Sequence, residues 1–142
     1  MSDAAINGHV SARGETLAQI STHLVQLHRR YYGKGPTKAK TQILDDLVVC
    51  ILMGGFTTVE RTLLETGEVE SVYQMRRSFK QVMEGEFRRI VEEATGRKVI
   101  GYMSSIHVDP DLAVELFVLE AMPEVEELVP SAAEANGGEG TC

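Results

Sequence analysis

The chain has 142 residues, of which 43% are hydrophobic and 25% are charged, a composition typical of one globular domain. Its net charge of −7 is uneven, because residues 120–142 hold six acidic and no basic residues, which leaves −1 for the rest. A nucleic-acid-binding domain would carry a basic surplus, and direct insertion into a membrane needs about 18 consecutive apolar residues. This chain has neither, so both functions are excluded.

The two ends of the chain differ in composition from the middle. Residues 1–13 are small and polar, and we expect them to be disordered. They lack the apolar core of a signal peptide, so we expect a cytoplasmic protein, in which Cys50 and Cys142 are free thiols. Residues 121–142 are expected to form an acidic flexible tail, with a loose helical turn over 123–129. This assigns residues 14–120 to the folded domain.

The first predicted element is a helix that ends near residue 32. Its apolar residues recur at steps of three and four: Leu17, Ile20, Leu24, Leu27 and Tyr31. Gly33 suits the position just after a helix, and Gly35-Pro36 prevents the helix from restarting. The alternative is that residues 33–36 form a loop that contacts an anion, although a phosphate-binding loop follows a strand and precedes a helix, the reverse of this order.

Residues 37–44 and 47–53 are predicted to be strands joined by a turn at Asp45-Asp46. The second strand, Leu-Val-Val-Cys-Ile-Leu-Met, is apolar at every position. Both of its faces should therefore be covered, at least in an oligomer.

Two helices and a second hairpin follow. Thr57 and Glu60 form a capping box for a short helix that Gly67 ends, and a long helix covers residues 68–95 before Gly96. Strands are predicted over residues 98–108 and 111–119, on either side of Asp109-Pro110. The order α-β-β-α-α-β-β predicts the α+β class, a single domain with an antiparallel sheet covered by helices.

The basic residues suggest an anion site. Arg76 and Lys80 share a face of the long helix, while Arg30 and Lys34 lie at the end of the first helix. If these two segments pack together, the four residues form a pocket for a carboxylate, phosphate or bicarbonate. The alternative is a solvated face paired with acidic residues of the helices, namely Glu60, Glu65 and Glu84. Arg76 follows Met75, so we expect it to be partly buried with a fixed partner.

No set of residues has the spacing of a catalytic or metal site. His23 and His28 lie on different sides of a helix, and His107 with Asp109 offers only two ligands. Cys50 lies in an apolar strand, where it is expected to pack as a small hydrophobe. We therefore expect no enzyme activity, no metal and no cofactor.

Several short motifs in this order resemble the bacterial MpsC-like (YbcI-like) family over roughly residues 16–119. The matching residues are Tyr32-Gly33-Lys34-Gly35-Pro36-Thr37, Asp45-Asp46 with the apolar run that follows, Thr57-x-x-Glu60, Arg76-Arg77-x-Phe79 and Thr95-Gly96-Arg97-Lys98-Val99. The resemblance implies a cytosolic accessory component of a sodium-translocating, membrane-potential-generating system that takes up inorganic carbon. It supplies no catalytic residues.

Two functional hypotheses follow. The first is a non-enzymatic accessory or regulatory protein linked to inorganic-carbon or ion uptake. It is expected to be a homodimer and to sit at the inner face of the membrane through a partner in a transporter complex. The alternative is a sensor that binds a small anion, such as bicarbonate, or a nucleotide through Arg76, Lys80, Lys34 and Arg30.

Overall fold

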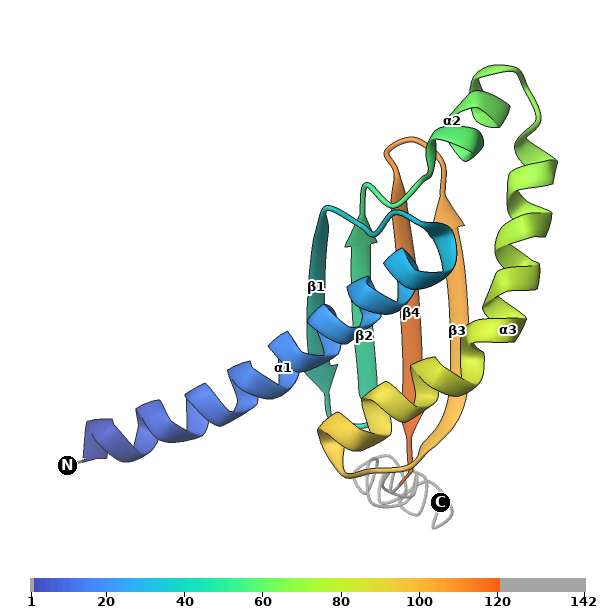
Figure 1. Cartoon of the computed structure of the whole chain (residues 1–142). Helices are drawn as coiled ribbons and strands as arrows, with labels where there is room; N and C mark the ends of the chain where they lie inside the picture. The colour runs from blue at the N-terminus through green and yellow to red at the C-terminus, as the bar shows by residue number, and fades with distance from the viewer. Residues whose placement is uncertain (1, 121–142) are drawn as a thin grey trace, which may run out of the picture.

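The protein is described by a computed structural model, which covers residues 2–120 and, for side chains, residues 12–120. Three helices and four strands follow in the predicted order: α1 (Ser2–Tyr32), β1 (Lys38–Leu44), β2 (Leu47–Met53), α2 (Thr58–Glu65), α3 (Val69–Thr95), β3 (Val99–His107) and β4 (Leu112–Leu119). The strands form one antiparallel sheet in the order β1-β2-β4-β3, and α1 crosses it diagonally (Figure 1). The predicted α+β fold is confirmed.

The N-terminal segment differs from the sequence-based expectation. Residues 2–13, expected to be disordered, belong to α1. Extending an existing helix adds one hydrogen bond for each residue that is ordered, and alanine, which occurs at positions 4, 5 and 12, has the highest helix propensity. The predicted acidic tail over residues 121–142 lies outside the described residues.

The predicted helix ends are confirmed. The N–H of Gly33 donates to the carbonyl of Arg29 at 2.9 Å, and Gly33 has the positive φ of 80° that glycine adopts without strain. At the start of α2, Thr57 and Glu60 form the reciprocal hydrogen bonds of a capping box. These local signals place α1 and α2 relative to the strands on either side.

The hydrophobic core fills the space between the helices and one face of the sheet. Alternate residues of each strand point into it, as the pleat requires. The principal core side chains are Ile20, Leu24 and Leu27 of α1, Val48, Cys50 and Leu52 of β2, Met83, Phe87 and Val91 of α3, and Phe117 and Leu119 of β4. A positive φ of 54° at Asp45 closes the tight turn between β1 and β2.

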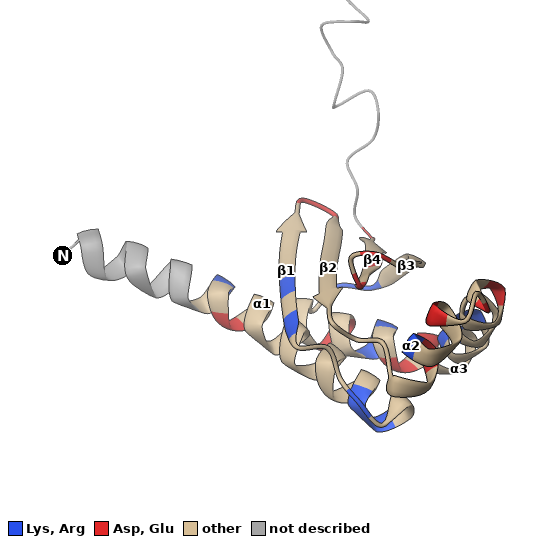
Figure 2. Ribbon diagram, turned by 90° about the horizontal axis from the view of Figure 1, so that it is seen from above, with Lys and Arg blue, Asp and Glu red and all other residues tan. Residues whose placement is uncertain are grey.

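The other face of the sheet, which we call the open face, is not covered by any described helix. Figure 2 shows the three helices on one side of the strands only. Strand pairing places four residues of each strand on the open face: Lys38, Lys40, Gln42 and Leu44 of β1, Leu47, Val49, Ile51 and Met53 of β2, Leu112, Val114, Leu116 and Val118 of β4, and Gly101, Met103, Ser105 and His107 of β3. The all-apolar β2 is thus covered on one side only within residues 2–120.

Candidate functional site

Arg76, the basic residue expected to need a partner, is buried in a bidentate ion pair. Its Nε donates to Glu60 Oε2 at 2.5 Å, and its Nη2 donates to Glu60 Oε1 at 2.6 Å. Nη2 also donates to the carbonyl of Gly55 at 3.0 Å, and Cζ lies 4.0 Å from the centre of the Tyr32 ring. Arg76 is 9% exposed and Glu60 is 0% exposed. The pair therefore joins α2 to α3, with Tyr32 of α1 stacked on the guanidinium.

The surroundings keep both members of this pair charged. Burial acts to raise the pKa of Glu60, but hydrogen bonds from Arg76 and Thr57 outweigh it and leave this pKa below its ordinary value. Burial acts to lower the pKa of Arg76, and Glu60 reverses that effect, so the pKa ends above its ordinary value. The same carboxylate caps α2 and neutralises Arg76, which makes Arg76 a structural anchor with little charge left for a ligand.

Lys34 lies at a different place, beside the loop that connects β2 to α2. Its Nζ donates to the carbonyl of Phe56 at 3.2 Å. The carboxylate of Asp111 accepts from the backbone N–H groups of Gly55 at 3.2 Å and Phe56 at 3.0 Å. Lys34 therefore helps to hold this loop, and it lines a shallow hollow separate from Arg76 and Lys80.

Lys80 and Arg76 line one side of a small cleft between α3 and β3, which we call the α3–β3 cleft. Its volume is about 170 Å³, and its lining residues are Tyr73, Arg76, Arg77, Lys80, Ser104, Ser105 and Ile106. Lys80 Nζ donates to the carbonyl of Ser104 at 3.3 Å. Within the described part of the chain, neither Arg77 nor Lys80 forms a salt bridge.

Arg30, the fourth residue of the predicted site, lies on the surface between α1 and α3. It is 71% exposed, and its Nη1 is 3.5 Å from Glu86 Oε2. Glu86 also accepts from the Tyr31 hydroxyl at 2.7 Å. Of the four residues predicted to bind an anion, the structure thus brings only Arg76 and Lys80 together.

A polar cluster that the sequence did not predict lies beneath the α3–β3 cleft. The Tyr102 hydroxyl donates to Glu115 Oε2, and His28 Nε2 lies 3.7 Å from Glu115 Oε1. His28 also bonds through Nδ1 to the carbonyl of Leu24 at 2.7 Å. Burial and the nearby Glu115 raise the pKa of Tyr102. The sequence contains one indication of this cluster, because Glu115 is an acidic residue in the otherwise apolar strand β4. A carboxylate on the covered face of the sheet requires a polar partner.

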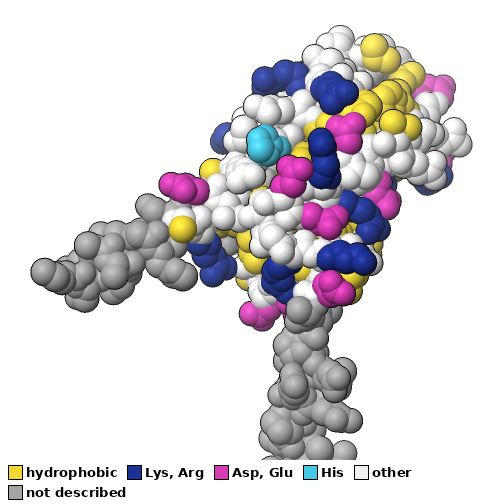
Figure 3. All heavy atoms as spheres, turned by 60° about the horizontal axis from the view of Figure 1, so that its bottom comes forward, with side chains coloured by type: hydrophobic (Ala, Val, Ile, Leu, Met, Phe, Trp, Pro, Cys, Tyr) yellow, Lys and Arg dark blue, Asp and Glu magenta, His cyan; other side chains and the backbone are white. Residues whose placement is uncertain are grey.

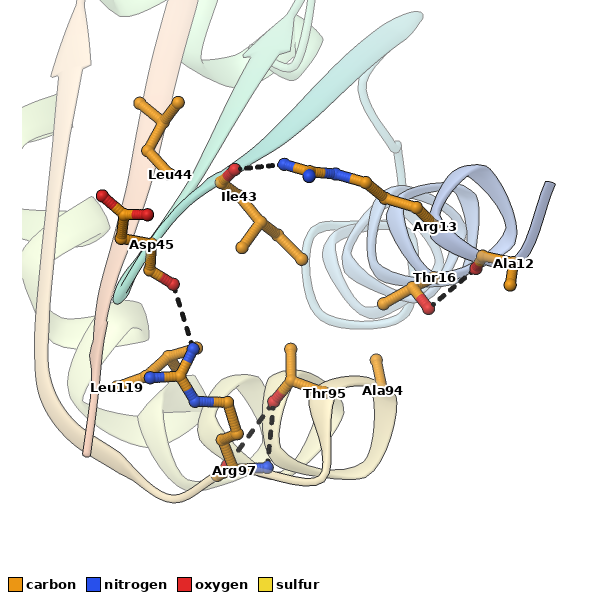
Figure 4. A pocket seen from close by; sticks show the side chains of 10 residues that line it. All are labelled: Ala12, Arg13, Thr16, Ile43, Leu44, Asp45, Ala94, Thr95, Arg97 and Leu119. Carbon is orange, nitrogen blue, oxygen red and sulfur yellow. Dashed lines mark hydrogen bonds between the residues drawn. The ribbon is translucent and has the colours of Figure 1, made fainter. Parts of the chain in front are cut away.

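Another hollow lies between α1, the β1–β2 turn and the end of α3, with a volume of about 650 Å³. In Figure 4, Arg13 and Arg97 both extend toward the β1–β2 hairpin. Arg13 Nη2 donates to the carbonyl of Ile43 at 2.7 Å, and Arg97 binds the Asp46 carboxylate and the carbonyl of Asp45. Both guanidinium groups thus hold neighbouring segments together.

The surface shown in Figure 3 has interspersed acidic and basic side chains, with no extended area of one sign. Among the side chains of residues 12–120, no three His, Cys, Asp or Glu gather where they could hold a metal ion. No described helix has an apolar stretch long enough to cross a bilayer. The distinctive features are therefore the open face and the α3–β3 cleft.

These features define the class: a single-sheet α+β protein with helices on one side and a sheet face that no described helix covers on the other. The chain belongs to the MpsC family, described as "Na+-translocating membrane potential-generating system (MpsC)", whose sequence profile matches residues 12–121. The family resemblance found from the motifs is thus confirmed.

Two Bacillus subtilis (strain 168) proteins are similar to this chain. YrhF, described as uncharacterized, is 29% identical over 102 residues, and the match covers 67% of this chain and 80% of YrhF. YbcI, also described as uncharacterized, is 27% identical over 101 residues, 69% of this chain and 77% of YbcI. No solved structure matches the chain.

Proposed function

We propose that this chain is a non-enzymatic accessory protein of a membrane-potential-generating system linked to inorganic-carbon or ion uptake. It acts in the cytoplasm, at the inner face of the membrane, by binding other proteins. Family membership supports the link to the membrane system, whose family description names Na⁺ translocation and membrane potential. Homodimer formation is part of this proposal.

The observation that carries the proposal is the open face. Its two central strands, β2 and β4, present eight apolar side chains and no charged one. A large contiguous apolar area on the surface of a soluble domain usually marks a contact surface for another protein. Several cationic side chains already hold helices and loops together, as Arg76 and Arg97 do. The fold is thus well suited to presenting a rigid surface.

Co-purification tests the proposal. The full chain is tagged and expressed in its native cells, and membranes are solubilised in mild detergent. We expect the membrane components of the system to be recovered with the chain, and deletion of the gene to lower the membrane potential reported by a voltage-sensitive dye. Growth of the deletion strain at low CO₂ should improve when bicarbonate is added. An unchanged membrane potential and no recovered membrane component contradict the proposal.

A second candidate function is a small-anion sensor at the α3–β3 cleft. The observation in its favour is the convergence of Arg77 and Lys80, both without salt bridges among the described residues, with Ser104 on the opposite wall. A volume of about 170 Å³ is below the usual range of about 300–1,000 Å³ for drug-sized ligands, so the cleft suits a small oxyanion such as bicarbonate or phosphate. The proposed roles of Arg30 and Lys34 have no geometric support here.

Thermal unfolding with and without bicarbonate, phosphate or ATP tests this candidate. An anion present at 100 times its dissociation constant should stabilise the fold by about 2.7 kcal/mol. The variants Arg77→Ala and Lys80→Ala should lose that gain, whereas Arg89→Ala, an exposed position on the same helix, should keep it. Equal stabilisation of all three variants by an anion argues against the cleft as its site.

A further inference from the structure

The arrangement of side chains on the open face is regular. Strand pairing forms four rows across β1, β2, β4 and β3, for example Gln42, Val49, Leu116 and Met103. Apolar residues occupy every position of the two central strands, and lysines occur only on β1, at one margin. Met103 is 53% exposed and Leu44 is 59% exposed, so large apolar side chains face water in the single chain. This exposure is unfavourable unless another surface covers them.

The margins of the sheet favour contact through the face over contact through an edge. The edge strand β1 carries Lys38 and Lys40, and charged residues on edge strands oppose edge-to-edge pairing. The other edge strand, β3, has a register shift between Val99 and Gly101, which also disrupts pairing with an incoming strand. The apolar surface available for association is therefore the face itself.

The size of the open face is adequate for a specific dimer. Four strands about 4.8 Å apart and seven residues at about 3.4 Å each give a flat area of about 19 by 24 Å. Two such faces bury roughly 900 Å² if they are treated as flat. Protruding side chains make the real surface larger than a flat one, which brings the contact to the threshold of about 1,000 Å² for a biological interface.

We infer that the open face binds the open face of a second copy, so that two sheets pack against each other with the helices outside. This rests on the proposed function, of which it names one partner. Packed sheets align their strands within about 30°. A two-fold axis close to the strand direction then places β1 of each copy over β3 of the other.

This orientation makes the face complementary to itself. It keeps the lysines of the two copies at opposite margins, because β3 has no Lys or Arg on the open face. It also places Leu44 over Gly101, which has no side chain and leaves room for it. The other orientation, with β1 over β1, brings Lys40 close to Lys40 of the second copy.

Sedimentation equilibrium and light scattering of the full chain test the inference. We expect the unaltered protein to be a dimer and Val49→Lys, at the centre of the face, to weaken dimerisation at least about 100-fold, because the ammonium group would be buried without a partner. The matched control is Val82→Lys, an exposed valine of α3 that is 66% exposed, which should leave the dimer unchanged. Circular dichroism verifies folding, and Met103→Lys replaces Val49→Lys if that variant does not fold.

The outcomes separate this inference from the proposed function. Dissociation by Val49→Lys or Met103→Lys, together with an unchanged Val82→Lys dimer, supports the inference. An unaltered protein that is monomeric, or a dimer that survives the open-face substitutions, overturns it. If such a protein still co-purifies with the membrane components, the inference has failed and the proposed link to the membrane system stands; a monomer also removes the homodimer from that proposal.

Discussion

Replacing Arg76 with methionine should destabilise the fold strongly. The substitution leaves the Glu60 carboxylate, which is 0% exposed, with only the Thr57 backbone N–H and hydroxyl as hydrogen-bond donors. Removing one member of a buried ion pair costs about 3–5 kcal/mol, because the remaining charge is desolvated without compensation. Total stabilities of domains are about 5–15 kcal/mol, so the loss is a large share of the free energy of unfolding.

The stabilities of the unaltered protein and of the Arg76→Met variant should also change in opposite directions on acidification. In the unaltered protein the pKa of Glu60 lies below its ordinary value of 4.5, so its contribution to stability is present above pH 4.5 and is lost as the pH falls toward the folded-state pKa. Without Arg76, burial is the dominant influence and raises the pKa of Glu60. The variant should therefore gain stability on mild acidification, and the difference between the two proteins should be largest at neutral pH.

Urea denaturation at pH 7 and at pH 5 measures both quantities. The neighbouring exposed substitution Arg77→Met serves as control, with an expected change within about 0.5 kcal/mol. The double variant Arg76→Met with Glu60→Leu should recover part of the loss, because it removes the unpaired charge. A cost below about 1 kcal/mol for Arg76→Met at pH 7 would refute the view of Arg76 as a structural anchor.

Three further outcomes are expected. Thr57→Ala should lower the free energy of unfolding by about 1 kcal/mol through loss of the α2 cap, while Thr57→Ser should keep it; equal losses in urea titrations would contradict this. In a Cys142→Ser protein, Cys50 should react with a thiol reagent only on unfolding, because burial raises its pKa to about 11; rapid reaction of the folded protein at pH 8 would count against it. Glu115→Ala should cost about 1–3 kcal/mol by leaving the part-buried Tyr102 hydroxyl without its acceptor, and Glu115→Gln should cost less in the same urea titrations; equal costs would exclude the hydrogen bond as the reason.

Local signals predicted the elements because they act over a few residues. The capping box at Thr57 and Glu60, the glycine at position 33 and the apolar spacing of α1 each depend on neighbours within one or two turns of a helix. Strand order is a different matter. β4 lies beside β2 in the centre of the sheet, and β3 lies at the edge. The physical reason is burial: β4 is apolar at almost every position, whereas β3 contains Gly101, Ser104 and Ser105, which lose less at an edge.

The predicted anion site shows the same contrast between local signals and tertiary packing. Its residues were grouped by charge and by distance along the chain, and the structure separates Lys34 and Arg30 from Arg76 and Lys80. The partner of Arg76 is 16 residues away on another helix, a distance that no helical periodicity encodes.

The sequence by itself determined the class of fold, the order of the elements, their caps and the family. Tertiary structure alone decided that Arg76 is neutralised by Glu60, that Tyr102 and His28 surround Glu115, and that the second face of β2 is open. Helices and turns follow from interactions between near neighbours, whereas ion pairs and exposed faces follow from how the whole chain distributes burial among its segments.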